Sequence, residues 1–374
     1  MAYDHRDFDK LNVDIFAGKA GKHVLFQPRI NCWYDDKKYL GQPLPGELEG
    51  CTPARMYRKL KVSNRIYDYG ACFERRFDAD VKVTSEQIGE RKTLMRWTTP
   101  VGELTSVIRG NSSNPGCYYD KFQVETPEDI RVRTYLEEAT VWSFRPDIFE
   151  KLQAEWKGLG APTMFICRTT IQECIVETMG VENTVYALTD EPELMEGYFE
   201  AITRGQESLL DALIQSPIQI INYGDNLHGG ILSPYWFEKY IQPVYLHRRE
   251  RLKPHGKFLH SHWDGDLKPL LPYTHTCGLD GIEAMTPLPQ GDVPLEEILE
   301  SLGDDLILLD GIAAILFQDT YPEEMLMEQV ETLLQKLGGR LILGISDEMP
   351  SLGDIERVKK VRDRVERWNA EQKD

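Results

Sequence analysis

The chain has 374 residues, of which 41% are hydrophobic and 28% charged, so it can bury a large core as an ordinary globular protein. Its 43 Lys and Arg residues against 61 Asp and Glu residues give a formal charge of -18, which excludes nucleic acid and anionic membrane surfaces as expected partners. No apolar run approaches the roughly 18 residues needed to span a bilayer, so we expect no membrane span and a cytoplasmic protein.

The cysteines give no sign of a disulfide framework or of a closed structural zinc site. They are odd in number and show no C-x-x-C spacing. We expect reduced thiols, most of them structural, at Cys32, Cys51, Cys72, Cys117, Cys167, Cys174 and Cys277.

Taken in chain order, eight short apolar runs are predicted strands. Several are apolar along their whole length rather than alternating, as strands of a parallel sheet covered on both faces are. The runs are Val24–Asn31, Phe77–Val83, Thr163–Thr169, Ile218–Asp225, Lys257–Asp264, Gly281–Met285, Leu306–Ile312 and Arg340–Ser346.

Helix signals separate these strands. Ser233 fits an N-cap and Pro234 the first helical position, Gly256 stands beyond the end of that helix, and Pro243 predicts a kink within it. Two later segments carry apolar residues at helical spacing, namely Leu326, Val330, Leu333, Leu334 and Leu337, and then Ile355, Val358, Val361, Val365 and Trp368.

This alternation predicts an α/β fold of the (β/α)₈ TIM barrel type, forming a single domain over residues 1–374. A doubly wound sheet is the alternative, although no G-x-G-x-x-G or G-x-x-x-x-G-K-[ST] marks a nucleotide site. Residues 32–60 are predicted to form a long loop before a helix near Thr52, and residues 91–110 a hairpin turning at 100–102. Both insertions are expected at the C-terminal face of the barrel.

In a barrel, the residues that end each strand converge on one mouth. The predicted strand ends are far richer in polar and charged side chains than the strand interiors. They supply Arg29, Asn31, Trp33, Arg168, Asn222, Asp225, Asn226, His260, His262, Asp264, Glu283, Asp310, Ser346, Asp347 and Glu348.

Several of these segments resemble the uroporphyrinogen decarboxylase superfamily, which includes the cobamide-dependent methyltransferases. NYGDNLHGGILSPYWFEKYIQPV resembles its G-D-D-x-G and S-P-x-x-F segment, and HWDG stands where the family has H-x-C-G. GIEAMTPLPQGDVPLEEI, LLDGI and LILGISDEMPSLGDIERV are similar to its later segments. The resemblance covers nearly the whole chain, is strongest from about Ile218 onward, and implies the TIM barrel.

The residues present separate the two chemistries that the resemblance implies. True uroporphyrinogen decarboxylases begin with R-Q-A-G-R-Y and carry a histidine in the last strand. Here the first strand ends QPRINCWYDD, with one arginine, and Ile345 or Ser346 falls at the histidine position. Arg29 with Trp33 and Tyr34 suits a smaller, compact or aromatic substrate. A decarboxylase of a small carboxylated substrate is therefore the alternative function.

The methyltransferase branch binds zinc through H-x-C and a later cysteine, so the resemblance implies a metal site here. His262 keeps the histidine, Asp264 replaces the first cysteine, and Glu283 and Glu348 are the nearest oxygen donors for the remaining positions. Oxygen donors leave zinc more Lewis acidic than thiolates do, which suits polarising an ether oxygen.

The expected function is metal-dependent methyl transfer from a small, methoxylated aromatic donor to the cobalt of a corrinoid. The corrinoid is expected on a separate partner protein, because nothing in the chain resembles the corrinoid-binding sequence D-x-H-x-x-G. The residues assigned to catalysis are Asp225, His260 and His262. Those assigned to substrate binding are Arg29, Asn31, Trp33, Tyr34 and Asn226.

Each assignment has a simpler structural alternative. The histidines can be hydrogen-bonded core residues, Asp225 can cap a helix, and Arg29 and Glu283 can form ordinary ion pairs. A non-catalytic relative, with neither metal nor turnover, is the third hypothesis. The sequence leaves the methyl donor, the direction of transfer and the oligomeric state open.

Overall fold

The computed structural model describes residues 4–110 and 118–372. The chain divides into two compact units, of which the first comprises Met1–Gly70, Asp147–Ile166 and Ile218–Asp374, and the second Ala71–Pro146 and Cys167–Pro217. The single domain expected over residues 1–374 stays a prediction.

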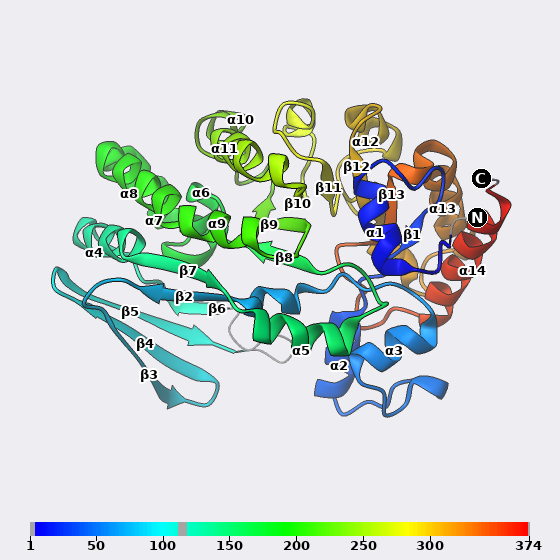
Figure 1. Cartoon of the computed structure of the whole chain (residues 1–374), viewed down its shortest axis with the longest axis horizontal. Helices are drawn as coiled ribbons and strands as arrows, with labels where there is room; N and C mark the ends of the chain where they lie inside the picture. The colour runs from blue at the N-terminus through cyan, green and yellow to red at the C-terminus, as the bar shows by residue number, and fades with distance from the viewer. Residues whose placement is uncertain (1–3, 111–117, 373–374) are drawn as a thin grey trace. The chain divides into compact units, whose positions relative to one another are not determined.

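A parallel sheet of seven strands forms the centre of the first unit. The strands pair in the order β1-β13-β12-β11-β10-β9-β8, so that β1 from the start of the chain lies beside β13 from its end (Figure 1). They coincide with seven of the eight predicted strands. Their bounds are β1 (Leu25–Phe26), β8 (Thr163–Ile166), β9 (Ile220–Leu227), β10 (Phe258–Trp263), β11 (Gly281–Glu283), β12 (Ile307–Ala313) and β13 (Leu341–Ser346).

An irregular segment, residues 62–66, occupies the eighth position between β1 and β8. The Ser63 N–H donates to the carbonyl of Phe26 at 3.0 Å, and Ile66 forms a parallel bridge with Pro162, just before β8. The segment therefore joins the two edge strands. The fold is the predicted α/β TIM barrel.

The prediction of a barrel strand at Phe77–Val83 was wrong. Its first residue ends β2 (Phe73–Phe77), which pairs antiparallel with β7 (Thr140–Phe144), and its last two begin β3 (Lys82–Gly89), in which every residue is exposed. The segment 62–66, which takes the place expected for it, carries Ser63, Asn64 and Arg65 and is therefore not an apolar run.

Helices connect the strands of the first unit. Helix α13 packs on β12 and β13, α14 packs on β1, and the predicted apolar stripes of both are buried except for Trp368, which is half-buried. The helix bounds are α1 (Phe8–Phe16), α2 (Asn31–Tyr39), α3 (Pro53–Leu60), α5 (Pro146–Trp156), α10 (Pro234–Trp236), α11 (Gln242–Leu252), α12 (Leu295–Leu302), α13 (Glu323–Leu337) and α14 (Ile355–Glu371).

The predicted features of the helix after β9 are present. The Ser233 hydroxyl caps α10 by accepting from the N–H of Trp236, and a π-helical turn, Phe237–Ile241, separates α10 from α11. Pro243 lies in the first turn of α11, where its missing N–H leaves no bond unmade. Gly256 ends the following 3-10 turn in the left-handed conformation.

The loop predicted for residues 32–60 is shorter than expected. Helix α2 occupies residues 31–39, and only residues 40–52 remain between it and α3, with a 3-10 turn at Gly46–Leu48. Thr52 caps α3, as predicted, by accepting from the N–H of Arg55.

The second unit contains two antiparallel sheets and five helices among its described residues. Strands β4 and β5 form the hairpin predicted for residues 91–110, with its turn at 100–101. Besides β2, β3 and β7, its elements are β4 (Lys92–Thr99), β5 (Gly102–Arg109), β6 (Tyr118–Lys121), α4 (Pro127–Glu138), α6 (Thr170–Glu173), α7 (Val181–Asp190), α8 (Pro192–Gly205) and α9 (Glu207–Gln215).

Across residues 4–110 and 118–372, no helix combines the length and the apolar character that crossing a membrane requires. Within the same ranges the six cysteines are free thiols, as expected, and Cys117 lies outside the described residues.

Backbone contact at Gly344, on β13, offers a test of barrel packing. A Cβ atom added there would meet the carbonyl of Gln27 at 2.6 Å and the carboxylate of Asp310, and the backbone oxygen cannot move aside. We expect Gly344→Ala to lower the free energy of unfolding by about 1–3 kcal/mol. Gly197→Ala is the control, because that exposed site in α8 is open and alanine favours a helix. Thermal melts should therefore shift in opposite directions, and a Gly344→Ala melt unchanged from the natural protein would contradict the packing.

Candidate metal centre

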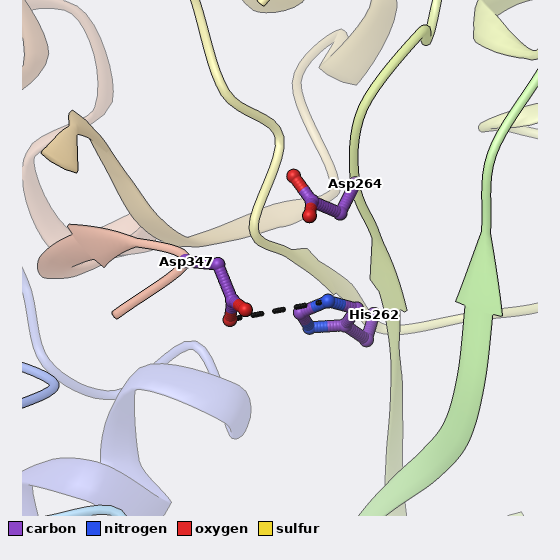
Figure 2. A group of neighbouring side chains, drawn as sticks. All are labelled: His262, Asp264 and Asp347. Carbon is purple, nitrogen blue, oxygen red and sulfur yellow. Dashed lines mark ion pairs between the residues drawn. The ribbon is translucent and has the colours of Figure 1, made fainter. Parts of the chain in front are cut away.

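Three ligand-type side chains come together at the carboxyl ends of β10 and β13. His262 lies in β10, Asp264 directly follows that strand, and Asp347 directly follows β13 (Figure 2). One ligand atom from each lies within 4.8 Å of the other two, and His262 Nε2 is 3.9 Å from Asp347 Oδ1. All three side chains are partly accessible, so solvent and small molecules can reach the group.

Glu283, at the end of β11, fixes the orientation of the His262 ring. Its Oε1 lies 2.9 Å from His262 Nδ1, and this contact leaves Nε2 facing Asp347. A carboxylate on the far nitrogen is the usual partner of a histidine that binds a metal. Burial alone lowers the pKa of His262, but the hydrogen bond and charge of Glu283 outweigh it, and the net pKa is raised.

Arg65, from the closing segment 62–66, lies beneath this group and is buried. It binds Asp310 through both terminal nitrogens, at 3.1 and 2.8 Å, and binds Glu283 at 2.9 Å. Burial raises the pKa of Glu283, yet Arg65 and the two histidines hold it well below its usual value. Glu283 therefore stays ionised, it already binds Arg65 and His262, and its predicted ligand role stays a prediction.

Arg29 binds the two acidic residues that follow β13. Its Nη1 lies 2.6 Å from Asp347 Oδ1, and its Nε and Nη2 each lie 3.1 Å from Glu348 Oε1. Glu348 thus faces Arg29, whereas Asp347 lies between Arg29 and His262. The predicted ligand role of Glu348 stays a prediction, and the geometry brings Asp347 to the group in its place.

The mouth carries more negative than positive charge. Its carboxylates are Asp264, Glu283, Asp310, Asp347 and Glu348, and the cations that the structure places among them are Arg29 and Arg65. Burial raises the pKa of both Asp310 and Glu348, because it disfavours an ionised carboxylate, and added positive charge would oppose that shift. A divalent cation would supply that charge, and nitrogen and oxygen donors are ligands that zinc accepts.

Two non-glycine residues at the neighbouring strands β11 and β12 have backbones in the left-handed region. The φ of Ala284, after β11, is 63° and that of Asp310, within β12, is 75°. Such conformations cost energy and persist only where the surroundings impose them. Asp310 also makes the two-point contact with Arg65.

His260 lies deeper than His262. Its side chain is fully buried, its Nδ1 is 3.2 Å from Glu283 Oε2, and its ring centroid is 5.8 Å from that of Phe16 in α1. Burial lowers its pKa, so the ring is neutral in the folded protein near pH 7. These contacts favour the structural alternative for His260, and its catalytic role stays a prediction.

Asp225 is also buried, and its Oδ2 accepts a hydrogen bond from Tyr245 of α11 at 2.7 Å. The same hydroxyl lies 2.6 Å from Ser261, whose neighbours His260 and His262 point into the barrel. This contact places Asp225 against the helix layer, not beside His262. Asn226 is exposed at the end of β9, and Arg168 pairs with Glu177 within the second unit.

The residues predicted to bind substrate from the start of α2 are mostly buried. The Trp33 ring is 1% exposed and donates from Nε1 to the carbonyl of Gly353, and the Tyr34 hydroxyl donates to the carbonyl of Cys51. Asn31 accepts from the hydroxyl of Tyr57. These contacts are structural, and substrate binding by the three residues stays a prediction.

Sequence reasoning missed Arg65 and Tyr67 and placed Asp347 at the mouth without a role. The available signal was an arginine between Val62 and Ile66, in a short segment that directly precedes helix η2 (Tyr67–Cys72). A charged residue in such a stretch is rarely buried unless it is paired.

Removing Arg65 should expose how much the site depends on it. We expect Arg65→Ala to lower the free energy of unfolding by about 3–5 kcal/mol, because two buried carboxylates lose their main cation. Burial would then raise their folded pKa above the unfolded values, so stability would fall as pH rises. Denaturant titrations should show a larger loss at pH 8 than at pH 5. Arg65→Lys, which keeps the charge, should lose less, and a loss independent of pH would contradict the ion-pair account.

The buried position of Trp33 makes a second test. Trp33→Ala should cost about 3–5 kcal/mol of stability, because it removes a packed indole and leaves a cavity. Trp33→Phe keeps most of the packing and should cost less. Thermal melts measure both effects, and lost substrate affinity at unchanged stability would instead support the predicted binding role.

Comparison with known proteins adds the family. Residues 169–368 match the model of the family "Uroporphyrinogen decarboxylase (URO-D)". No curated protein matches the chain. A methyltransferase from Methanosarcina mazei has a similar structure, with a TM-score of 0.55 and 13% identity over 97% of this chain and 99% of that chain, which shows a shared fold.

A second solved structure, the GH18 chitinase ChiB from the chitin utilization locus of Flavobacterium johnsoniae, covers 57% of this chain and 78% of its own at 14% identity. Its TM-score of 0.30 is too low to support any argument. The family match, in contrast, spans more than half of the chain, including β9 to β13 and their connecting helices. The chain belongs to the uroporphyrinogen decarboxylase family.

Proposed function

We propose that this protein is a metal-dependent methyltransferase, which moves a methyl group from a small methoxylated aromatic donor to the cobalt of a corrinoid on a separate protein. The observation that carries the proposal is the group His262, Asp264 and Asp347 at the barrel mouth. Family membership and the shared fold with a protein named as a methyltransferase support an enzyme of this kind.

Zinc is the metal that we propose for this group. His262 Nε2 and one oxygen each of Asp264 and Asp347 would hold it, and three protein ligands leave the fourth position for substrate, as in catalytic sites. When bound, the ion would act as a Lewis acid toward the ether oxygen of the donor. This set replaces the predicted Glu283 and Glu348 by Asp347.

The surrounding side chains have separate tasks in this proposal. Glu283 holds the Nδ1 proton of His262, so that Nε2 is the donor atom. Arg65 keeps Glu283 ionised. Arg29 offsets the negative charge of Asp347 and Glu348 when no metal ion is bound.

The alternative, decarboxylation of a small carboxylated substrate, predicts a basic pocket with arginines free to bind carboxylates. In the described part of the mouth, Arg65 is matched by Glu283 and Asp310, and Arg29 by Asp347 and Glu348. This pairing leaves little positive charge for an acidic substrate. The charge balance therefore supports a cation rather than an anion as the ligand.

Zinc analysis of single variants tests the proposal. His262→Ala should lose zinc and activity together, because the two carboxylates that remain bind zinc weakly. Asp264→Ala and Asp347→Asn each keep the histidine and should lose zinc less completely. Glu348→Gln is the matched control and should keep its zinc, since Glu348 faces Arg29. The measurements are zinc per chain and methyl transfer from guaiacol to an added corrinoid protein.

Thermal melts should stay close to that of the natural protein in each variant, because the open end of a barrel contributes little to the packed core. Full zinc and activity in His262→Ala would contradict the site. A natural protein without metal but with decarboxylase activity would favour the alternative.

A further inference from the structure

One aromatic side chain inside the barrel is exposed. Phe165, in β8, is 40% exposed, although the other residues of its strand are buried. It pairs in register with Asn222 of β9, which in turn pairs with His260 of β10. Residues in register on parallel strands face the same side, and His260 points inward to Glu283. The open face of Phe165 therefore lies within the barrel mouth.

Gly224, two residues after Asn222, makes room for this ring. A Cβ atom at Gly224 would collide with the edge of the Phe165 ring, whereas glycine leaves that space free. Any larger residue would push the ring out of its position. The β8–β9 side of the mouth is thus shaped around one aromatic ring.

Tyr67 extends this surface toward the candidate metal centre. Its ring meets that of Phe165 edge to face, with centroids 5.3 Å apart and an interplanar angle of 74°. Its hydroxyl accepts from Asn222 Nδ2 at 2.9 Å and lies 3.3 Å from Glu283 Oε2. Since Glu283 also binds His262, a chain of contacts runs from the two rings through Glu283 to the histidine that we propose as a metal ligand.

The mouth therefore has two unlike sides. The ends of β1, β12 and β13 carry charged groups that are paired with one another, and the end of β8 carries an open aromatic ring. We propose that Phe165 and Tyr67 form a subsite for an aromatic ring of the substrate, which rests on the proposed function for the chemistry at His262. Two rings at an edge-to-face angle form a corner that a third ring can fill by stacking.

Binding of a matched pair of ethers tests the subsite. Anisole and methoxycyclohexane share the methoxy group and the ring size and differ in aromaticity. The zinc-loaded natural protein should bind anisole more tightly, as measured by NMR titration. Phe165→Ala should raise the Kd for anisole about tenfold, which corresponds to about 1.4 kcal/mol, and should change the Kd for methoxycyclohexane less.

Control variants separate the subsite from general damage. Phe165→Leu keeps an apolar side chain and should fall between the natural protein and Phe165→Ala. Tyr235→Ala removes another exposed ring, on α10, and should leave both dissociation constants unchanged. Zinc content should be the same in all four proteins, because Phe165 is not a ligand, and thermal melts measure the packing lost with the Phe165–Tyr67 contact.

The outcomes for the subsite and for the proposed function are distinct. Equal affinity for anisole in the natural protein and in Phe165→Ala would overturn the subsite, as would failure of the natural protein to bind anisole. Anisole binding that depends on Phe165, in a protein that transfers no methyl group to corrinoid, would support the subsite and count against the proposed function. Methyl transfer that is indifferent to Phe165 would do the reverse.

Discussion

The buried guanidinium of Arg65 is the constraint on which the rest of the mouth depends. A charge without water around it requires matched partners, and Glu283 and Asp310 supply them from two neighbouring strands. Because Arg65 also lies in the segment between β1 and β8, one residue joins the ring of strands to the polar network inside it. Glu283, held by Arg65, in turn orients the ring of His262 through a hydrogen bond.

Much of the fold follows from the sequence, because buried parallel strands are short apolar runs and seven such runs were found. The eighth position escaped this reasoning for a physical reason. Residues 62–66 put Ser63 and Arg65 into the barrel, where hydrogen bonds and ion pairs replace apolar packing. Phe77–Val83 has a composition better suited to a barrel strand. In the structure it contains the end of β2 and the start of β3, which belong to antiparallel sheets of the second unit.

The candidate site shows the same limit at the level of single side chains. His262 and Asp264 were predictable, because they stand on and just after one strand at the family's spacing. The choice between Asp347 and Glu348 was not, since consecutive residues after a strand point in different directions and only the position of Arg29 separates them. Trp33 was assigned to a loop, but the helix there turns its ring into the core.

The close approach of Gly344, on β13, to Asp310, on β12, limits which residues each of the two positions can carry. Asp310 has a left-handed backbone and binds Arg65, and its carboxylate lies close to where a Gly344 side chain would start. A replacement at Gly344 therefore meets two obstacles, the carboxylate of Asp310 and the carbonyl of Gln27, and a smaller residue at position 310 would remove only the first and would also cost Arg65 a partner. Position 344 should therefore stay glycine in relatives with or without the buried arginine, because the carbonyl of Gln27 belongs to the barrel backbone.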